Sequence, residues 1–295
     1  MGSGETEGIR SIPALSRLWE GEVTPLSIEQ LASKAEAVFL ALPDSVAATV
    51  GPELIERGVR VFDLSGAFRL QNPKQRTRWY PATPTLTEPV VYGLTELNRT
   101  ALIGARLIAC PGCYPTAALL ALSPLHNAHL LDGDIIIDAK SGVSGAGKTP
   151  SERTHFSECH GNTAAYGVFA HRHGSEIEQE LQHTVTFTPH LIPLDRGILE
   201  TIYVRIKREV READVITALE DAYRDCPFVR LTGDTLPEIK HVVHTNFCDI
   251  GWKIDADSGR LILVACLDNL IKGAAGQALQ NLNVAFGFDE TIGLL

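Results

Sequence analysis

The run AVFLAL at residues 37–42 opens the part of the sequence that decides the fold. Its apolar residues are continuous rather than alternating, which is typical of a strand buried on both faces of a parallel sheet. Residues 46–57 follow with apolar side chains at helical spacing, and residues 59–64 form a second apolar run. This strand–helix–strand order predicts an α/β fold with a Rossmann-like, doubly wound parallel sheet.

The later part of the chain shows a different pattern. Its apolar runs are richer in β-branched residues and lie further apart, and one of them alternates apolar and polar positions. This favours a second, α+β domain on a mixed or antiparallel sheet. We expect strands at 107–110, 134–138, 185–188, 201–206 and 261–265, helices at 116–125, 175–181, 212–225 and 273–286, and a surface loop over 70–89.

Composition excludes several classes of protein. The 295 residues carry a net charge of −10, which argues against nucleic acid as the main partner. The sequence has no apolar stretch long enough to predict a membrane span. Six scattered cysteines without a signal peptide predict a reduced, cytoplasmic protein.

Cys113 follows a Pro-Gly turn between an expected strand and an expected helix. Thiolate is the nucleophilic form of cysteine, and the N–H groups and dipole at a helix start stabilise that anion. The same N–H groups can hold the oxyanion formed when sulfur attacks a carbonyl. The arrangement favours a thiol acyl-transfer enzyme, with a small buried core cysteine as the alternative.

Cys110 and Cys113 also form a C-x-x-C pair, which can be redox-active or half of a zinc site. The sequence offers no second such pair and no nearby pair of histidines, so we expect no metal site. Cys110 is instead expected to end the buried strand.

His171, Arg172 and His173 stand together directly before the helix expected at 175–181. A histidine can move a proton near neutral pH, and an arginine can bind a phosphate or a carboxylate. The alternative is a solvated polar turn in which one residue caps the helix.

Residues 142–149 match the phosphate-loop pattern G-x-x-x-x-G-K-[ST] letter for letter. A true phosphate loop needs an amphipathic helix to start at its Lys-Thr, and the polar sequence that follows has no apolar stripe. A nucleotide triphosphatase is therefore disfavoured. A glycine-rich loop whose backbone approaches a cofactor fits better. Asn269 precedes a helix rich in small residues, which could pack against another helix or against a cofactor ring.

Seven runs taken together resemble a known family. They are VFDLSGAFR at 61–69, PGCYPT at 111–116, SGVSGAG at 141–147, HRH at 171–173, FTPHL at 187–191, RGILE at 196–200 and DNLIKGAA at 268–275. In this combination the sequence resembles the N-acetyl-gamma-glutamyl-phosphate reductases of arginine biosynthesis. That family is similar in fold to the aspartate-semialdehyde and glyceraldehyde-phosphate dehydrogenases.

The resemblance implies a role for each matched position. Cys113 would attack an acyl phosphate, release inorganic phosphate and form a thioester that NADPH reduces to the semialdehyde. His173 would be the general acid and base, in preference to His171. The cofactor site would comprise Ser65, Gly66, Ser141, Gly142, Gly145 and Asn269, and candidates for substrate contact are Arg69, Tyr166, Arg172 and Glu176.

One departure concerns the start of the chain. The family opens with a strand, a glycine-rich turn and a helix that hold the dinucleotide pyrophosphate, and residues 1–8 are not of that kind. We expect an incomplete dinucleotide-binding domain at 1–112, completed by the C-terminal helix at 269–295. A catalytic and dimerisation domain is expected at 113–268, in a homo-oligomeric (dimeric or tetrameric) enzyme.

Two other functions remain open at this stage. The nearest is the lysine-pathway reductase, which acts on an aminoadipyl phosphate, although Tyr114-Pro115 is more similar to the arginine enzyme. The other is a non-catalytic homologue that serves as a binding or assembly subunit. The departure at the start of the chain favours it, and the presence of Cys113 and His173 disfavours it.

Overall fold

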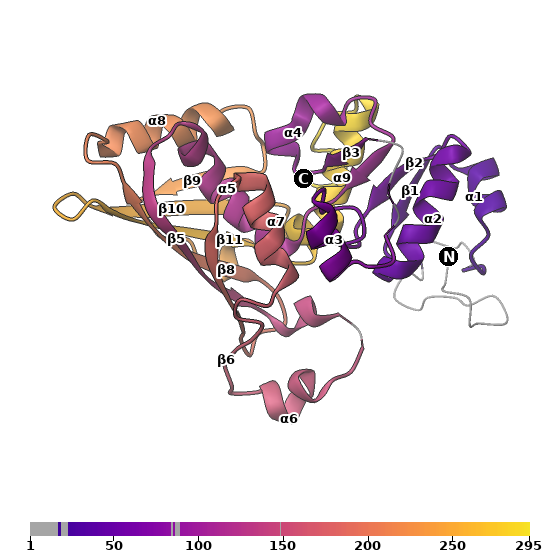
Figure 1. The fold of residues 1–295 in the computed structure, drawn as a ribbon, viewed down its shortest axis with the longest axis horizontal. Helices are drawn as coiled ribbons and strands as arrows, with labels where there is room; N and C mark the ends of the chain where they lie inside the picture. Colours follow the sequence, from indigo (N-terminus) through magenta and orange to yellow (C-terminus); the bar gives the residue numbers. More distant parts are fainter. Residues whose placement is uncertain (1–16, 19–22, 84, 86–88, 148) are drawn as a thin grey trace.

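The first of two β-sheets is parallel, with the strand order β1-β2-β4-β3 (Figure 1). The computed structural model describes residues 17–18, 23–83, 85, 89–147 and 149–295, and its first sheet confirms the expected parallel α/β domain. The strands are β1 (Ala37–Leu40), β2 (Arg60–Asp63), β3 (Val90–Tyr92) and β4 (Leu107–Ala109).

Helices cover both faces of this sheet, as the continuous apolar strands require. On one face, α2 (Asp44–Glu56) packs its buried Leu54 against Val61 of β2. On the other face, α9 (Gly276–Phe286) packs Ala278 and Ala285 against strand residues of β2 and β4. The last helix of the chain is therefore part of the core around the first sheet.

The second sheet has seven strands in the order β6-β7-β5-β8-β11-β10-β9. Two of its strand pairs, β5·β7 and β10·β9, are parallel and the rest are antiparallel, so the expected mixed sheet is confirmed. The strands are β5 (Leu131–Ser141), β6 (Ala164–Ala165), β7 (Val185–Leu191), β8 (Ile198–Ile206), β9 (Val229–Gly233), β10 (Cys248–Asp255) and β11 (Arg260–Leu267).

Three helices pack on one face of the second sheet and form the largest core. They are α5 (Cys113–Asn127), α7 (Arg172–Leu181) and α8 (Glu212–Tyr223). Leu120 of α5, Ile177 of α7 and Leu219 of α8 are fully buried against alternate residues of the strands. The remaining elements are α1 (Ile28–Lys34), α3 (Pro73–Trp79), α4 (Thr95–Leu102), α6 (Phe156–Cys159), the 3₁₀ turns Val143–Ala146, Glu152–Thr154 and Ile239–His241, and a π-helical turn at Ile271–Ala275.

The surface loop expected over 70–89 is wrong for part of its length, because Pro73–Trp79 forms the helix α3. No residue of this helix is buried, so it has no apolar period to detect. The helix is instead stabilised by the capping of its first turn. The side chain of Asn72 accepts hydrogen bonds from the N–H groups of Lys74 (3.0 Å) and Gln75 (3.3 Å), and proline suits the first helical turn.

The two sheets meet at the loop that follows β4. The strand β4 belongs to the first sheet, and α5 begins four residues after the strand ends and packs on the second sheet. In Figure 1, α3 and α7 lie side by side at this junction. The indole N–H of Trp79 donates to the Ser175 hydroxyl at 3.0 Å and joins the two helices. Cys113 therefore lies where both halves of the molecule come together.

Candidate active site

Cys113 is the first residue of α5, and Gly112 is its N-cap. The side chain is half-buried, and the Tyr114 N–H group points at its sulfur. Burial raises the pKa of the thiol to about 11, although the Tyr114 N–H group and the charge of Arg69 act in the opposite direction. At neutral pH the cysteine is therefore a thiol and needs a base to become a nucleophile.

His173 lies directly against the turn before Cys113. A methyl group on Gly112 would come within 2.5 Å of the His173 Nε2 atom, so only glycine leaves room for the ring. Burial lowers the pKa of His173 well below its usual value, with help from His171, Arg69 and Arg172. A neutral imidazole can take the proton of a neutral thiol that comes within hydrogen-bond reach, and His173 is packed against the residue before Cys113.

His171 acts as the N-cap of α7. Its Nδ1 atom accepts the N–H group of His173 at 3.1 Å and caps the start of α7. Burial, followed by the charge of Arg172, lowers the pKa of His171 to about 4. A ring nitrogen that accepts this bond is not free to accept a second proton, which favours His173 as the base.

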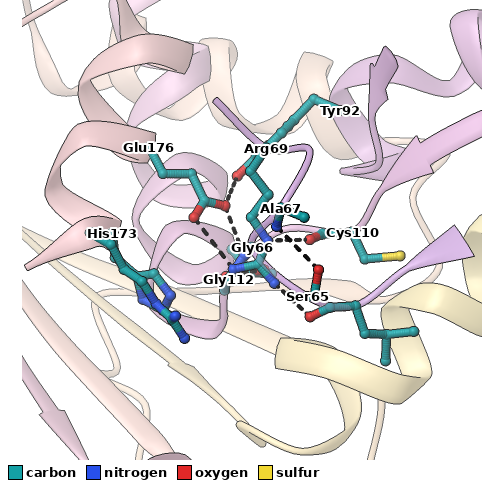
Figure 2. Close-up of polar contacts among 12 residues, drawn as sticks. Ser65, Gly66, Ala67, Arg69, Tyr92, Cys110, Gly112, His173 and Glu176 are labelled. Carbon is teal, nitrogen blue, oxygen red and sulfur yellow. Dashed lines mark hydrogen bonds and ion pairs between the residues drawn. The ribbon is translucent and has the colours of Figure 1, made fainter. Parts of the chain in front are cut away.

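Glu176 ties the Cys113 turn to both sheets (Figure 2). Its Oε1 atom accepts hydrogen bonds from the Gly112 N–H group and the Tyr92 hydroxyl, both at 2.8 Å. Its Oε2 atom lies 3.5 Å from the guanidinium of Arg69. Arg69 in turn donates to the carbonyl oxygens of Cys110 (2.7 Å) and Leu64 (3.0 Å). These two predicted site residues thus form a buried bridge behind the turn.

A second buried bridge lies on the other side of Cys113. The π-helical turn at Ile271–Ala275 places Gly273 so close that a methyl group there would come within 2.7 Å of the Cys113 Cβ atom. In the same turn, the fully buried Lys272 donates to Glu96 at 2.6 Å and to the side-chain oxygen of Gln280 at 2.7 Å. Insertions of this kind in helices are frequent at functional sites.

Ser65 and Gly66 follow β2 and lie in a loop bound by acidic side chains. The Ser65 hydroxyl donates to Asp63 at 2.9 Å, and the Gly66 N–H group donates to Asp44 at 2.7 Å. Asp44 also contacts Arg172 at 3.3 Å, so this acidic residue links the loop to the start of α7. Burial raises the pKa of Asp63 to about 6.

Asn269 organises the glycine-rich loop after β5. Its side chain accepts the N–H group of Gly197 at 2.7 Å and donates to the Ser144 hydroxyl at 2.9 Å. A methyl group on Gly145 would come within 2.9 Å of the Ser141 hydroxyl oxygen, so these predicted residues are in contact. At Gly142, the backbone of 194–196 lies equally close.

Tyr166 reaches the site through Tyr114, the residue after the cysteine. The two hydroxyl oxygens are 3.2 Å apart, and the guanidinium of Arg153 lies 5.2 Å from the Tyr166 ring centre. The ring of Tyr114 also packs edge-on against His173, with the ring centres 5.9 Å apart. Tyr166 therefore lies one side chain away from the predicted nucleophile.

Glu200 was not predicted as a site residue, yet it is the most unusual group nearby. It is fully buried, and neither carboxyl oxygen has a hydrogen-bond partner within the described part of the chain. Ala139 and Ala265 lie opposite it on the neighbouring strands and leave room for its side chain. Burial raises the pKa of Glu200 well above its usual value, and the charge of its ionised form would raise the pKa of Cys113.

The phosphate-loop pattern and the C-x-x-C pair were both disfavoured as sites from the sequence, and the described residues around them have other surroundings. After the glycine-rich loop, residues 149–155 contain only a three-residue 3₁₀ turn rather than the helix of a phosphate loop, and Lys148 lies outside the described residues. All six cysteines are free, and Cys110 packs with α9 in a different core from Cys113. Among the residues that the structure describes, no group of acidic, histidine or cysteine side chains could hold a metal ion.

Several residues of the site were missed by the sequence reasoning. Tyr92, Asp44 and Gly273 are among them, together with the buried Lys272. Asp44 could have been predicted from the sequence, because it is an acidic residue that comes after a buried strand and a proline. Such a residue lies at a helix start, at the edge of the sheet where ligands bind. Contacts such as Tyr92 to Glu176 join residues 84 positions apart and leave no local pattern.

Comparison with known proteins places this geometry in a family. Residues 9–105 match the family model described as semialdehyde dehydrogenase, NAD binding domain, and residues 113–269 match semialdehyde dehydrogenase, dimerisation domain. An N-acetyl-gamma-glutamyl-phosphate reductase from Geobacillus sp. (strain WCH70) is 44% identical over 99% of this chain and 89% of the relative. The chain belongs to the N-acetyl-gamma-glutamyl-phosphate reductase family. The chain is also similar to reductases of the same name from two other bacteria. The one from Dehalococcoides mccartyi (strain ATCC BAA-2100 / JCM 16839 / KCTC 5957 / BAV1) is 45% identical over 90% of this chain and 81% of the relative. The one from Brevibacillus brevis (strain 47 / JCM 6285 / NBRC 100599) is 44% identical over 99% of this chain and 88% of the relative.

Solved structures show the same fold at lower sequence identity. Aspartate semialdehyde dehydrogenase II from Vibrio cholerae matches with a TM-score of 0.70 and 17% identity, over 95% of this chain and 87% of that chain. Membership of this reductase family confirms the resemblance, the fold class and the oxidoreductase class predicted from the sequence, together with the nicotinamide-dinucleotide-binding domain. In the described residues, no helix has the length and apolar character needed to cross a membrane.

Proposed function

We propose that this chain reduces N-acetyl-gamma-glutamyl phosphate to N-acetylglutamate semialdehyde and inorganic phosphate with NADPH, as a step of arginine biosynthesis. The observation that carries the proposal is the helix-start Cys113 with the neutral His173 ring packed against the turn before it. The relatives reported above are named for this compound rather than for an aminoadipyl phosphate.

The chemistry of the chain follows from the two protonation states. His173 takes the thiol proton as the Cys113 sulfur attacks the acyl carbon, so the thiolate forms only when it is needed. The N–H groups at the start of α5 are placed to stabilise the oxyanion. The bond between carbon and phosphate oxygen then breaks, His173 gives the proton to the departing phosphate, and a thioester remains on Cys113. After reduction, the carbon–sulfur bond breaks, the aldehyde leaves, and His173 passes a proton taken up from solvent to the sulfur.

The residues present fit a dinucleotide cofactor. The loops that carry Asp44, Ser65–Gly66 and Pro111–Gly112 follow three adjacent parallel strands, and such ligands bind at the carboxyl ends of parallel strands. We propose that Ser65 and Gly66 on one side, and Ser141, Gly142, Gly145 and Asn269 on the other, hold NADP(H). When bound, this cofactor supplies the hydride that reduces the thioester.

Four further residues have proposed positions around the substrate. Arg172 is partly exposed beside Asp44, and Tyr166 contacts the Tyr114 hydroxyl; both are proposed to contact the substrate or its phosphate. Arg69 and Glu176 are buried, and their hydrogen bonds are directed to the backbone around Cys113. We propose that these two act on the substrate through the position of the Cys113 turn.

The enzyme is proposed to be a cytoplasmic homo-oligomer. The face of the second sheet opposite α5, α7 and α8 exposes Ile136 and Tyr203, which together with Ile262 line a cavity of about 500 Å³. A second copy of the chain is the proposed occupant, because this region matches a dimerisation domain. The six free cysteines agree with a reducing compartment.

The reverse reaction tests the proposed function. Purified protein is mixed with N-acetylglutamate semialdehyde, inorganic phosphate and NADP⁺, and the absorbance of the reduced cofactor is followed. Phosphate-dependent reduction is expected in the wild type and should be lost in Cys113→Ser. The same activity in Cys113→Ser, or turnover that does not depend on phosphate, would contradict the mechanism.

A further inference from the structure

The carboxylate of Asp44 makes two contacts with residues of the predicted site. Its Oδ1 atom accepts the Gly66 N–H group at 2.7 Å, and its Oδ2 atom lies 3.3 Å from the Arg172 guanidinium. One donor comes from the loop after β2, the other from the start of α7. Asp44 thus joins the two halves of the molecule at this point.

These donors form an arrangement suited to an oxyanion. A backbone N–H group and a guanidinium are the usual donors to phosphate oxygens, and the first turn of α2 adds the positive end of a helix dipole. Asp44 is itself the first residue of that 13-residue helix. Its negative charge therefore lies where a ligand's negative charge would be most stable.

Arg172 is held in this place by more than Asp44. Its guanidinium carbon lies 5.9 Å from the ring centre of Tyr80, and the Tyr80 ring in turn packs tightly over Gly66. The side chains of Asp44 and Arg172 are 35% and 46% exposed, so a ligand in solution can reach them. The position of Arg172 can therefore persist when its acidic partner is removed or turns away.

We propose that Asp44 occupies a phosphate position: in the absence of ligand its carboxylate holds the Gly66 N–H group and the Arg172 guanidinium, and a phosphate group displaces it. This deepens the proposed function, on which it rests for the nature of the ligand. The phosphate can belong to the acyl phosphate and its product, or to the dinucleotide. In both cases Asp44 weakens binding, because its contacts must be broken first, and it keeps Arg172 paired between turnovers.

Direct titration tests this proposal without any turnover. Inorganic phosphate is titrated into wild-type protein and Asp44→Asn at constant ionic strength, and binding is measured by calorimetry. Asp44→Asn is expected to bind phosphate about fivefold to tenfold more tightly, because a partly exposed ion pair and its hydrogen bond no longer compete. Asp221→Asn, which removes the same charge from the exposed pair with Arg224, should leave the affinity unchanged.

The double variant Asp44→Asn/Arg172→Gln should lose the gain in phosphate affinity, because the guanidinium that binds the phosphate is then absent. Parallel titrations with NADP⁺ identify the source: a gain for phosphate alone assigns the position to substrate, and a gain for NADP⁺ alone assigns it to cofactor. Unchanged or weaker binding of both ligands would overturn the proposal. If Asp44→Asn proves unstable, Asp44→Ser, with a favourable residue for a helix start, serves in its place. A failed reductase assay would leave these binding results intact.

Discussion

Two buried ion pairs flank the Cys113 turn, and they are built differently. The pair of Lys272 and Glu96 is fully buried, with a 2.6 Å contact, and Gln280 donates to the same carboxylate at 2.7 Å. The pair of Arg69 and Glu176 is longer, at 3.5 Å. In both pairs the Oε2 atom of the glutamate has no hydrogen bond within the described part of the chain, so the pairs differ in length and in the partners of Oε1.

This difference indicates that the two ion pairs have different roles. Burial alone would raise the pKa of Glu96, but Lys272 and Gln280 lower it below its usual value, so the carboxylate stays charged beside Lys272. Glu176 instead uses its better hydrogen bonds on Gly112 and Tyr92, next to the nucleophile. We infer that the first pair stabilises the fold and that the second sets the position of the turn.

Breaking the first pair should give the largest effect on stability. Lys272→Met leaves the buried Glu96 without its countercharge, and such a loss costs on the order of 3–5 kcal/mol of the free energy of unfolding. Chemical denaturation measures it. Lys240→Met, which breaks the exposed pair with Glu238, is the matched control and should cost far less stability than Lys272→Met. Similar small losses in both variants would contradict the assigned role of Lys272.

Glu176→Gln should cost less stability and more activity. The amide oxygen can still accept from Gly112 and Tyr92, but Arg69 loses its countercharge, for a cost of about 2 kcal/mol. Because the Cys113 turn shifts, kcat should fall by about tenfold or more while KM changes little. Steady-state kinetics on the folded fraction tests this. A variant with wild-type kcat would show that Glu176 does not position the turn.

Tyr92→Phe isolates one hydrogen bond of the same network. It removes the hydroxyl that donates to Glu176 and leaves the Arg69 contact in place, so a loss of about 1 kcal/mol is expected. The effect on kcat should be smaller than that of Glu176→Gln. If Tyr92→Phe lowers kcat more than Glu176→Gln does, the hydroxyl has a role beyond orienting the carboxylate.

Glu200 is a third buried acid near the site, and within the described residues its carboxyl has no hydrogen-bond partner, although the charge of Lys140 partly opposes the effect of burial on its pKa. Burial raises its pKa above the usual 4.5, so the folded protein keeps a proton that the unfolded chain releases as the pH rises. Stability relative to Glu200→Gln should therefore fall as the pH rises above about 4.5, and the two proteins should differ least at pH 4. Chemical denaturation of both proteins at several pH values shows whether this stability difference rises or falls with pH. A wild type that gains stability over the variant with rising pH would mean that the carboxylate is paired when folded.

The sequence predicted the elements with strong periodic signals and the site residues that lie in continuous motifs. The run at 37–42, the helix after Cys113 and the mixed second sheet all have such signals, and the structure contains each of them. The helix α3 was missed because a cap at Asn72 forms it without an apolar face. The bridges around Cys113 were missed because they form only when distant segments pack, as Lys272 does with Glu96.

The central claim is that Cys113 carries the acyl group, and trapping that group tests it most directly. Protein is incubated with N-acetylglutamate semialdehyde and NADP⁺ without phosphate, so that a thioester can form but cannot be released to phosphate. Mass spectrometry of the digested protein then locates the adduct. We predict an N-acetylglutamyl group on the peptide that contains Cys113, discharged when phosphate is added. Cofactor reduction without an adduct on Cys113, or with the adduct on another residue, would contradict the account.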